Sequence, residues 1–172
     1  HATTEYLVIN LTLNETLPTL FKKREKKIEY DLEHHENFFL IHTNINFAKN
    51  FKIMKSHEQS FQKWEDFILY KKNNLILDFI LLKDWLIRLE RTEGCENIII
   101  LNLDSNLEHK ITFDEEAYHL SLDHGYEYET DIFRYTYSSP TTPKSIFDYD
   151  CKSKKKELKK TQEIPSGHNK DD

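Results

Sequence analysis

The sequence predicts an all-β fold, and three observations lead to this prediction. Apolar and polar residues alternate along many short segments, which is the period of a half-buried strand. The 172 residues include 11 Phe and 9 Tyr, residue types that favour sheets over helices. The alternating segments also recur in groups of four, which indicates a repeated unit of four short strands.

The clearest pair of strands lies within Asp131–Asp150. Its first half, Phe133–Tyr137, alternates large aromatic residues with Arg and Thr. The segment Ser138–Pro143 then breaks the alternation with two prolines, which cannot donate a hydrogen bond to a strand ladder. The chain must therefore turn there, and Ser145–Tyr149 is expected to return as the partner strand.

The first half of the chain carries shorter segments of the same kind. Two of them flank a polar turn at Asn14-Glu15, and four more follow the basic link Lys22–Lys27. Ser56–Glu65 is mostly polar and is expected to be a loop. The expected strands, in order, are Glu5–Asn10, Leu17–Phe21, Ile28–Leu32, Asn37–Thr43, Phe51–Met54 and Phe67–Tyr70.

Two further groups of four strands are expected in the second half. Turn-forming residues separate several of them, at Lys83-Asp84, Glu93-Gly94 and Asp104–Asn106. Ile164–Asp172 shows no periodicity and is expected to be a linker or a frayed tail. Besides the pair already described, the expected strands are Leu75–Leu82, Trp85–Arg91, Asn97–Leu103, Glu108–Phe113, Ala117–Leu122 and Lys155–Thr161.

The spacing of the groups predicts the architecture. The second strands of the three groups align at Phe39, Trp85 and Phe133, so the offsets are 46 and 48 positions. A four-stranded repeat of roughly 40 to 50 residues is the signature of a β-propeller blade, whereas an ordinary β-sandwich would show it only by accident. The prediction is a partial β-propeller of about three and a half four-stranded antiparallel blades. Trp64, Trp85 and the tyrosines are expected to pack between blades, because aromatic rings bury a large area.

The same repeat predicts where the chain divides. Closed propellers have about four to eight blades, so three and a half blades are expected to be part of a ring. The two ends of this partial ring would expose strand edges unless another chain covers them. Self-association through cut blade edges is therefore one expected mode of partnership. The first residue is His1 rather than Met, which suggests a fragment or a processed chain. The divisions are the outer half of an incomplete blade at 1–27, blades at 28–72, 73–115 and 116–162, and a linker at 163–172.

Composition narrows the classes of function. The net charge of −6 argues against nucleic acid as a partner. The most apolar run, Leu75–Leu82, is too short to span a bilayer and contains Asp78, and no signal peptide is visible, so no membrane partner is expected. Cys95 and Cys151 lie 56 positions apart with no other Cys near either. This predicts two free thiols in a reducing compartment, the cytoplasm.

Some residues invite a functional interpretation beside a structural one. His34 and His35, with His42 nearby, suggest a metal site, but adjacent residues of a strand point to opposite faces, so a surface turn is expected instead. The basic runs Lys22–Lys27 and Lys152–Lys160 would suit an acidic partner or nucleic acid. The expected interpretation is outer strands whose lysines discourage pairing between sheet edges.

A second group of residues surrounds the acidic, tyrosine-rich loop Asp123–Asp131. Ser121, Asp123 and His124 suggest a catalytic triad, but closeness in sequence is not triad geometry, and no activated turn accompanies them. The loop itself has two interpretations that stay open. It either steers cationic peptides electrostatically or is simply a solvated connection.

Specific runs of residues match a known family. They are Tyr30–His35, Phe39–Asn44, Ala48–Phe51, Phe113–Glu115, Arg134–Pro143, Asp148–Asp150 and Glu157–Lys160. Through these runs, nearly the whole chain resembles the propeller of the oligopeptidase B (protease II) enzymes, within the prolyl oligopeptidase family of serine peptidases. The most specific part is the Tyr-Ser-Ser-x-Thr-Thr-Pro run that precedes Asp-Tyr-Asp.

The resemblance implies a seven-bladed propeller that caps an α/β-hydrolase domain and admits only short peptides, which oligopeptidase B cleaves after Lys or Arg. Glu5–Lys160 would correspond to the C-terminal half of that N-terminal propeller, and 163–172 would lead toward an α/β-hydrolase domain absent from this chain. The implied partners are this catalytic domain and the remaining blades of the same protein. Short basic peptides are the implied substrates of the parent enzyme.

The catalytic serine of that family lies in a G-x-S-x-G turn that lifts the hydroxyl for attack. The glycines of this chain are Gly94, Gly125 and Gly167, which are too far apart to form the motif. We therefore expect that this chain alone is not an enzyme and carries no catalytic, cofactor-binding or metal-ligating residue and no cofactor. The alternatives are a non-enzymatic protein-interaction β-propeller and a free-standing β-domain that self-associates.

Overall fold

A computed structural model describes residues 5–8, 18–116 and 118–163 of the chain. These ranges contain strands and one short 3-10 turn, η1, at Glu58–Ser60. No helix in them has the length and the apolar character needed to cross a membrane. The strands are β1 (Leu7–Val8), β2 (Thr19–Leu20), β3 (Tyr30–His35), β4 (Phe38–Thr43), β5 (Lys52–His57), β6 (Glu65–Ile68), β7 (Asn74–Leu81), β8 (Trp85–Thr92), β9 (Cys95–Asn102), β10 (Glu108–Lys110), β11 (His119–Leu122), β12 (Ile132–Ser138), β13 (Ser145–Asp150) and β14 (Lys155–Thr161).

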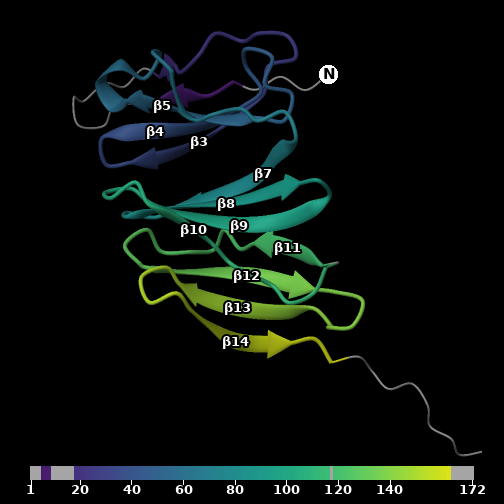
Figure 1. Cartoon of the computed structure of the whole chain (residues 1–172). Helices are drawn as coiled ribbons and strands as arrows, with labels where there is room; N and C mark the ends of the chain where they lie inside the picture. Colours follow the sequence, from purple (N-terminus) through teal and green to yellow (C-terminus); the bar gives the residue numbers. More distant parts are fainter. Residues whose placement is uncertain (1–4, 9–17, 117, 164–172) are drawn as a thin grey trace, which may run out of the picture. The chain divides into compact units, whose positions relative to one another are not determined.

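The strands form three four-stranded sheets and one two-stranded sheet, and in each sheet the spatial order follows the chain order (Figure 1). The large sheets are β3-β4-β5-β6, β7-β8-β9-β10 and β11-β12-β13-β14, and the small one is β1-β2. Sequential four-stranded antiparallel sheets are the blades of a β-propeller. The predicted fold class, an all-β partial propeller, is therefore confirmed.

Alternation places the aromatic residues of β12 as the sequence predicts. Phe133, Tyr135 and Tyr137 are buried, whereas Arg134 is exposed and Thr136 is half-buried between them. β12 pairs with β13 from Ile132↔Asp150 to Tyr137↔Ser145, so the prolines lie in the connection between the two strands. The predicted turn at residues 138–143 is confirmed, because Ser139 N donates to Thr142 O over 3.0 Å.

Three predictions about the first half of the chain are wrong. His34 and His35 are not a surface turn, because both belong to β3 and the turn to β4 follows them. Ser56 belongs to β5 and Glu65 opens β6, so the connection expected at Ser56–Glu65 is shorter at both ends. Backbone hydrogen bonds of a ladder do not require apolar side chains, which is why polar positions extend these strands. The residues of Lys22–Lys27 are not an outer strand, because they lie in the connection between β2 and β3.

Some expected elements extend beyond the described residues. Parts of the strands expected at Glu5–Asn10 and Leu17–Phe21 fall in residues 9–17. The first residue of the strand expected at Ala117–Leu122 and the tail expected at Ile164–Asp172 also lie outside the described part of the chain.

The chain forms two compact units, residues 1–76 and 77–172. In the second unit, residues from β7–β10 and from β11–β14 share one hydrophobic core. Ile87 and Ile100 of the first sheet and Tyr135 of the second are 0% exposed. Trp85 and Tyr137 belong to the same core, as expected for aromatics that pack between sheets.

The first unit has a smaller core that is also aromatic. Phe21, Tyr30, Ile41 and Met54 form it, with Trp64 packed against them. The ring of Trp64 meets that of Tyr30 edge-on at 5.2 Å between centroids, and Trp64 Nε1 donates to Phe61 O over 3.1 Å. Trp64 thus packs against this core while its indole N–H keeps a hydrogen-bond acceptor.

Candidate functional site

The carboxylate of Glu115 anchors the turn between β12 and β13. It accepts hydrogen bonds from the hydroxyls of Tyr137, Thr141 and Thr142, the last over 3.1 Å. Hydrogen bonds from Ser139, Thr141 and Tyr137 lower the pKa of Glu115 from 4.5 to about 2, because they favour the ionised form. Two of the runs that carry the family resemblance, Phe113–Glu115 and Arg134–Pro143, are thus in contact.

Ser139 also stabilises the turn through hydrogen bonds to backbone groups of the turn itself. Its Oγ accepts the backbone N–H of Thr141 over 3.2 Å and that of Thr142 over 2.9 Å. Ser145 Oγ donates to Pro143 O over 2.8 Å at the start of β13. Hydroxyl side chains suit this turn because each can accept a backbone N–H while donating to a carboxylate.

A cavity of about 250 Å³ lies beside this anchor. Aromatic side chains of Phe113, Tyr135 and Phe147 line it together with Glu115 and Lys156. The Lys156 ammonium lies 5.8 Å from the ring centroids of both Phe113 and Phe147, a distance at which a cation is attracted to an aromatic face. These residues offer binding contacts but no nucleophile paired with a base.

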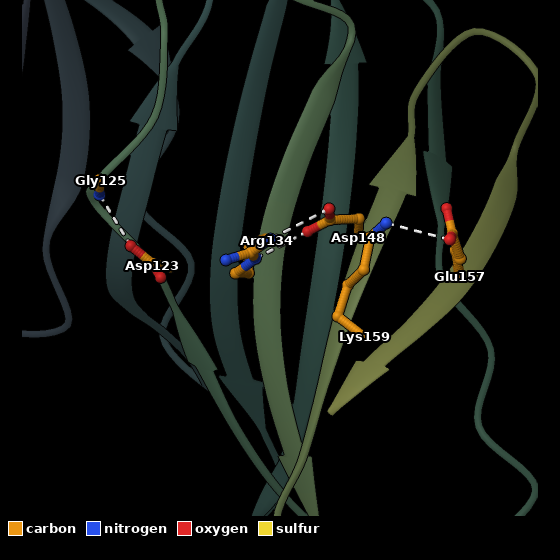
Figure 2. Close-up of polar contacts among 6 residues, drawn as sticks. All are labelled: Asp123, Gly125, Arg134, Asp148, Glu157 and Lys159. Atoms are coloured by element: carbon orange, nitrogen blue, oxygen red, sulfur yellow. Dashed lines mark hydrogen bonds and ion pairs between the residues drawn. The ribbon is translucent and has the colours of Figure 1, made fainter. Parts of the chain in front are cut away.

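The opposite face of the same sheet is charged (Figure 2). Arg134 on β12 donates to both carboxylate oxygens of Asp148 on β13, from Nε over 2.8 Å and from Nη2 over 3.2 Å. Lys159 pairs with Glu157 on β14 over 3.0 Å. Every residue of β14 is exposed and the strand is at the edge of its sheet, so the prediction of a lysine-rich outer strand here is confirmed.

Three four-stranded sheets in chain order, together with the anchored turn, lead to a family assignment. Residues 1–162 match the family described as prolyl oligopeptidase, N-terminal β-propeller domain. The chain belongs to this family.

Curated relatives agree with the assignment. The propeller chain is 28% identical over 149 residues to dipeptidyl aminopeptidase BI of Pseudoxanthomonas mexicana and 26% identical over 138 residues to protease 2 of Moraxella lacunata. The matches cover 86% and 80% of this chain but 20% of each relative, so the chain spans about a fifth of their length. The resemblance to protease II enzymes stated from the sequence is thereby confirmed.

Solved structures show the same fold. The oligopeptidase B structures from Trypanosoma brucei, with covalently bound antipain in a closed form, and from Leishmania major each align with a TM-score of 0.86. Each is 21% identical to this propeller chain, and the alignment covers 96% of this chain and 25% of the other. A structure of prolyl endopeptidases aligns with a TM-score of 0.77 at 15% identity.

The acidic loop 123–131 of this propeller chain has several structural partners. Asp131 accepts the indole N–H of Trp85 over 2.8 Å, and Glu129 lies 3.6 Å from the Lys83 ammonium. Asp123 accepts the N–H of Gly125 over 2.7 Å (Figure 2). Asp131 and Glu129 therefore attach the loop to residues 83–85 of the same unit, and Asp123 stabilises a turn within the loop, which favours the structural interpretation over steering.

The structure does not assemble a triad from Ser121, Asp123 and His124. His124 Nε2 lies 2.6 Å from Asp78 Oδ2, while the carboxylate of Asp123 faces Gly125. A triad requires the histidine to be held by its aspartate and to contact the serine. Among the contacts of the described residues, His124 is held by Asp78, and none of them joins it to Asp123 or to Ser121.

The three histidines that suggest a metal site have different neighbours. His34 lies 3.9 Å from Glu58, and the ring of His35 stacks on Phe38 with centroids 4.2 Å apart. His42 Nε2 lies 2.9 Å from Ile76 O. Within the described ranges, no group of three or more His, Cys, Asp or Glu side chains has a geometry suited to a metal ion.

Sequence reasoning missed the role of Glu115 and of the lysines near Tyr149. Glu115 had a usable signal, because it lies in one of the matched runs and the turn at 138–143 is rich in hydroxyls that need acceptors. The lysines carried no such signal, because their closeness depends on how β10 and the β13–β14 hairpin pack together.

Proposed function

We propose that this chain is part of the substrate-gating β-propeller of an oligopeptidase B-like serine peptidase and is not catalytic by itself. One observation carries the proposal. The match to the prolyl oligopeptidase propeller family runs through residues 1–162, a stretch that contains the three consecutive four-stranded sheets, from β3 to β14. A propeller of this family acts by restricting access to a catalytic domain rather than by chemistry of its own.

In this proposal the chain has partners within a longer protein. They are an α/β-hydrolase catalytic domain and the remaining propeller blades, and the parent enzyme cleaves short basic peptides after Lys or Arg. The sheets would be a half-blade at 1–27 and blades at 28–72, 73–115 and 116–162, with 163–172 as the linker. The chain spans about a fifth of the length of its curated relatives, which leaves room for both partners.

The non-catalytic part of the proposal is supported by the sequence. A nucleophilic serine in this family requires closely spaced glycines around it. Gly94, Gly125 and Gly167 are too far apart for that motif.

We also place the protein in the cytoplasm. Cys95 is exposed and Cys151 is buried, and both are free thiols. Burial, followed by the charges of Asp131 and Asp150, raises the pKa of Cys151, so this thiol stays protonated and unreactive. Two unpaired thiols suit a reducing compartment.

The proposal is tested by reading the coding sequence downstream of Asp172 and by assaying the purified chain. We expect a G-x-S-x-G-bearing domain downstream, and no hydrolysis of a fluorogenic Arg peptide by the chain alone. Attaching that domain and the remaining blades should restore hydrolysis and labelling by a serine-directed reagent. Hydrolysis that copurifies in stoichiometric amounts with the isolated chain would overturn the non-catalytic assignment.

The alternative function, a non-enzymatic interaction propeller, predicts a different downstream sequence. In that case the coding region would continue with further blades and without the nucleophile motif. Light scattering on the purified chain tests whether it self-associates. Self-association through cut blade edges predicts a dimer or a larger species. A stable monomer would exclude that mode of partnership.

A further inference from the structure

We infer that a lysine-lined pocket between β10 and the β13–β14 hairpin binds small molecules that carry phosphate groups. The pocket has a volume of about 380 Å³, within the range of about 300–1,000 Å³ that is common for ligand sites. Lys110, Lys154 and Lys156 line it together with His109 and Tyr149, and no Asp or Glu does. This composition stands out in a chain whose net charge is −6.

Two neighbouring sheets of the second unit build the pocket. His109 and Lys110 lie on β10, the outer strand that pairs with β9. Tyr149 on β13 is paired with Lys156 on β14. Lys154 ends the turn between these strands with a φ of 58°, and its N–H donates to Asp150 O over 2.8 Å. Sheet pairing and a tight turn therefore hold the three lysines around one opening.

A neutral polar pair lies beside the lysines. His109 Nε2 and the Tyr149 hydroxyl are 3.0 Å apart. Burial and the neighbouring Lys154 lower the pKa of His109, and burial, Cys151 and Asp150 raise the pKa of Tyr149. Both groups are therefore uncharged near pH 7. When Nε2 carries the proton and donates to the phenol oxygen, the Tyr149 O–H is available to donate to an anion.

The carboxylates nearest in sequence to these lysines bind other groups. Glu108 accepts from Arg88 over 3.1 Å, and Glu157 pairs with Lys159. Asp150 accepts the N–H of Lys152 over 2.9 Å and that of Ser153 over 3.1 Å. In these contacts Glu108, Glu157 and Asp150 form no ion pair with the pocket lysines.

The positive charge of the pocket favours the binding of an anion. No ion pair found among the described residues includes Lys110, Lys154 or Lys156. Like charges gathered around one cavity repel each other, and a bound anion would replace that repulsion with attraction. Lysine is a common phosphate ligand, and hydrogen bonds between charged partners are about twice as strong as neutral ones. The proposal does not depend on the peptidase assignment.

The test is a titration of the whole chain with pyrophosphate, followed by isothermal calorimetry and by amide chemical shifts. We expect saturable binding of one equivalent, with shifts concentrated at β10 and at residues 149–156. Replacing Lys156 by Ala or Lys154 by Ala should weaken binding about tenfold, since each removes a charged hydrogen-bond donor. Inorganic phosphate should bind more weakly at the same residues, because it offers fewer oxygens.

Lys155→Ala is the matched control. It removes the same charge from the same strand, but Lys155 points to the opposite face of β14 and does not line the pocket. We expect its affinity for pyrophosphate to equal that of the unmodified chain, and Lys156→Arg to retain most of the binding. Equal weakening by Lys155→Ala and Lys156→Ala, or shifts spread over all exposed lysines, would show general charge screening and overturn the proposal. Absence of saturable binding would overturn it as well.

Discussion

Glu115 shows how a single residue can connect distant parts of this chain. Its hydrogen-bond donors lie 22, 26 and 27 positions later, at the end of β12 and in the turn that follows it. A carboxylate that accepts several hydrogen bonds is stabilised in its ionised form. The turn therefore depends on the charge state of a residue outside it.

This dependence predicts how Glu115→Gln changes stability with pH. The pKa of Glu115 is lower in the folded chain, about 2, than its ordinary value of 4.5. Its stabilising contribution is thus present above pH 4.5 and is lost as pH falls toward 2. Thermal unfolding should show a lower Tm for Glu115→Gln at pH 7, with a difference from the unmodified chain that shrinks in acid.

The neighbouring Glu116 provides the control. It is exposed, and Glu116→Gln removes the same charge without removing an acceptor from the turn. We expect little change in its Tm at pH 7. A Tm difference for Glu115→Gln that stays constant from neutral to acidic pH would contradict the assigned role.

At the scale of elements, the β8–β9 hairpin depends on its two-residue turn. Thr92 pairs with Cys95, which leaves Glu93 and Gly94 as the turn, with φ values of 51° and 81°. Two positive φ values are typical of the turn type that matches the twist of paired strands. A Cβ at Gly94 would have no atom within 4 Å, so any cost of substitution comes from the backbone alone.

We therefore predict that Gly94→Ala lowers the free energy of unfolding by about 1 kcal/mol, because the left-handed conformation is unfavourable for an L-residue. Gly94→Asn should cost less, since Asn tolerates that conformation. Urea denaturation of the three chains measures both values. Equal stability of the Ala and Gly chains would mean that the turn changes its conformation freely.

At the scale of the whole molecule, the second unit carries its own core. All buried members of that core lie between Ile80 and Cys151, and they come from both of its four-stranded sheets. Two sheets that bury their inner faces against each other satisfy the minimum requirement for a stable β-structure. This unit should therefore fold without the first half of the chain.

We predict that residues 73–172 alone unfold cooperatively on heating and retain the near-ultraviolet dichroism of buried tyrosines. A chain of residues 73–115 is the control, because a single sheet would expose the core face that the second sheet covers. We expect that shorter chain to lack a cooperative transition. Loss of the transition in residues 73–172 would mean that the second unit needs contacts from residues before 73.

The fold and the turn at residues 138–143 were largely predictable, whereas the contacts by which Glu115 anchors that turn were not. Alternation at Phe133–Tyr137 predicted β12 because burial on one face of a strand produces a period of two in the sequence. Ser56 and Glu65 were misassigned because ladder hydrogen bonds extend strands through polar positions. The contact between Glu115 and Thr142 has no periodic signature, so no local pattern predicted it.

The sequence by itself determined the strands, their grouping in fours and the family, because these depend on neighbouring residues and on spacing along the chain. The tertiary structure alone decided which polar side chains meet. Lys156 lies beside Tyr149 because of strand register, and Tyr149 meets His109 because two sheets pack face to face. The contact between His109 and Tyr149 joins residues 40 positions apart, and at that separation only the packed fold sets the distance between side chains.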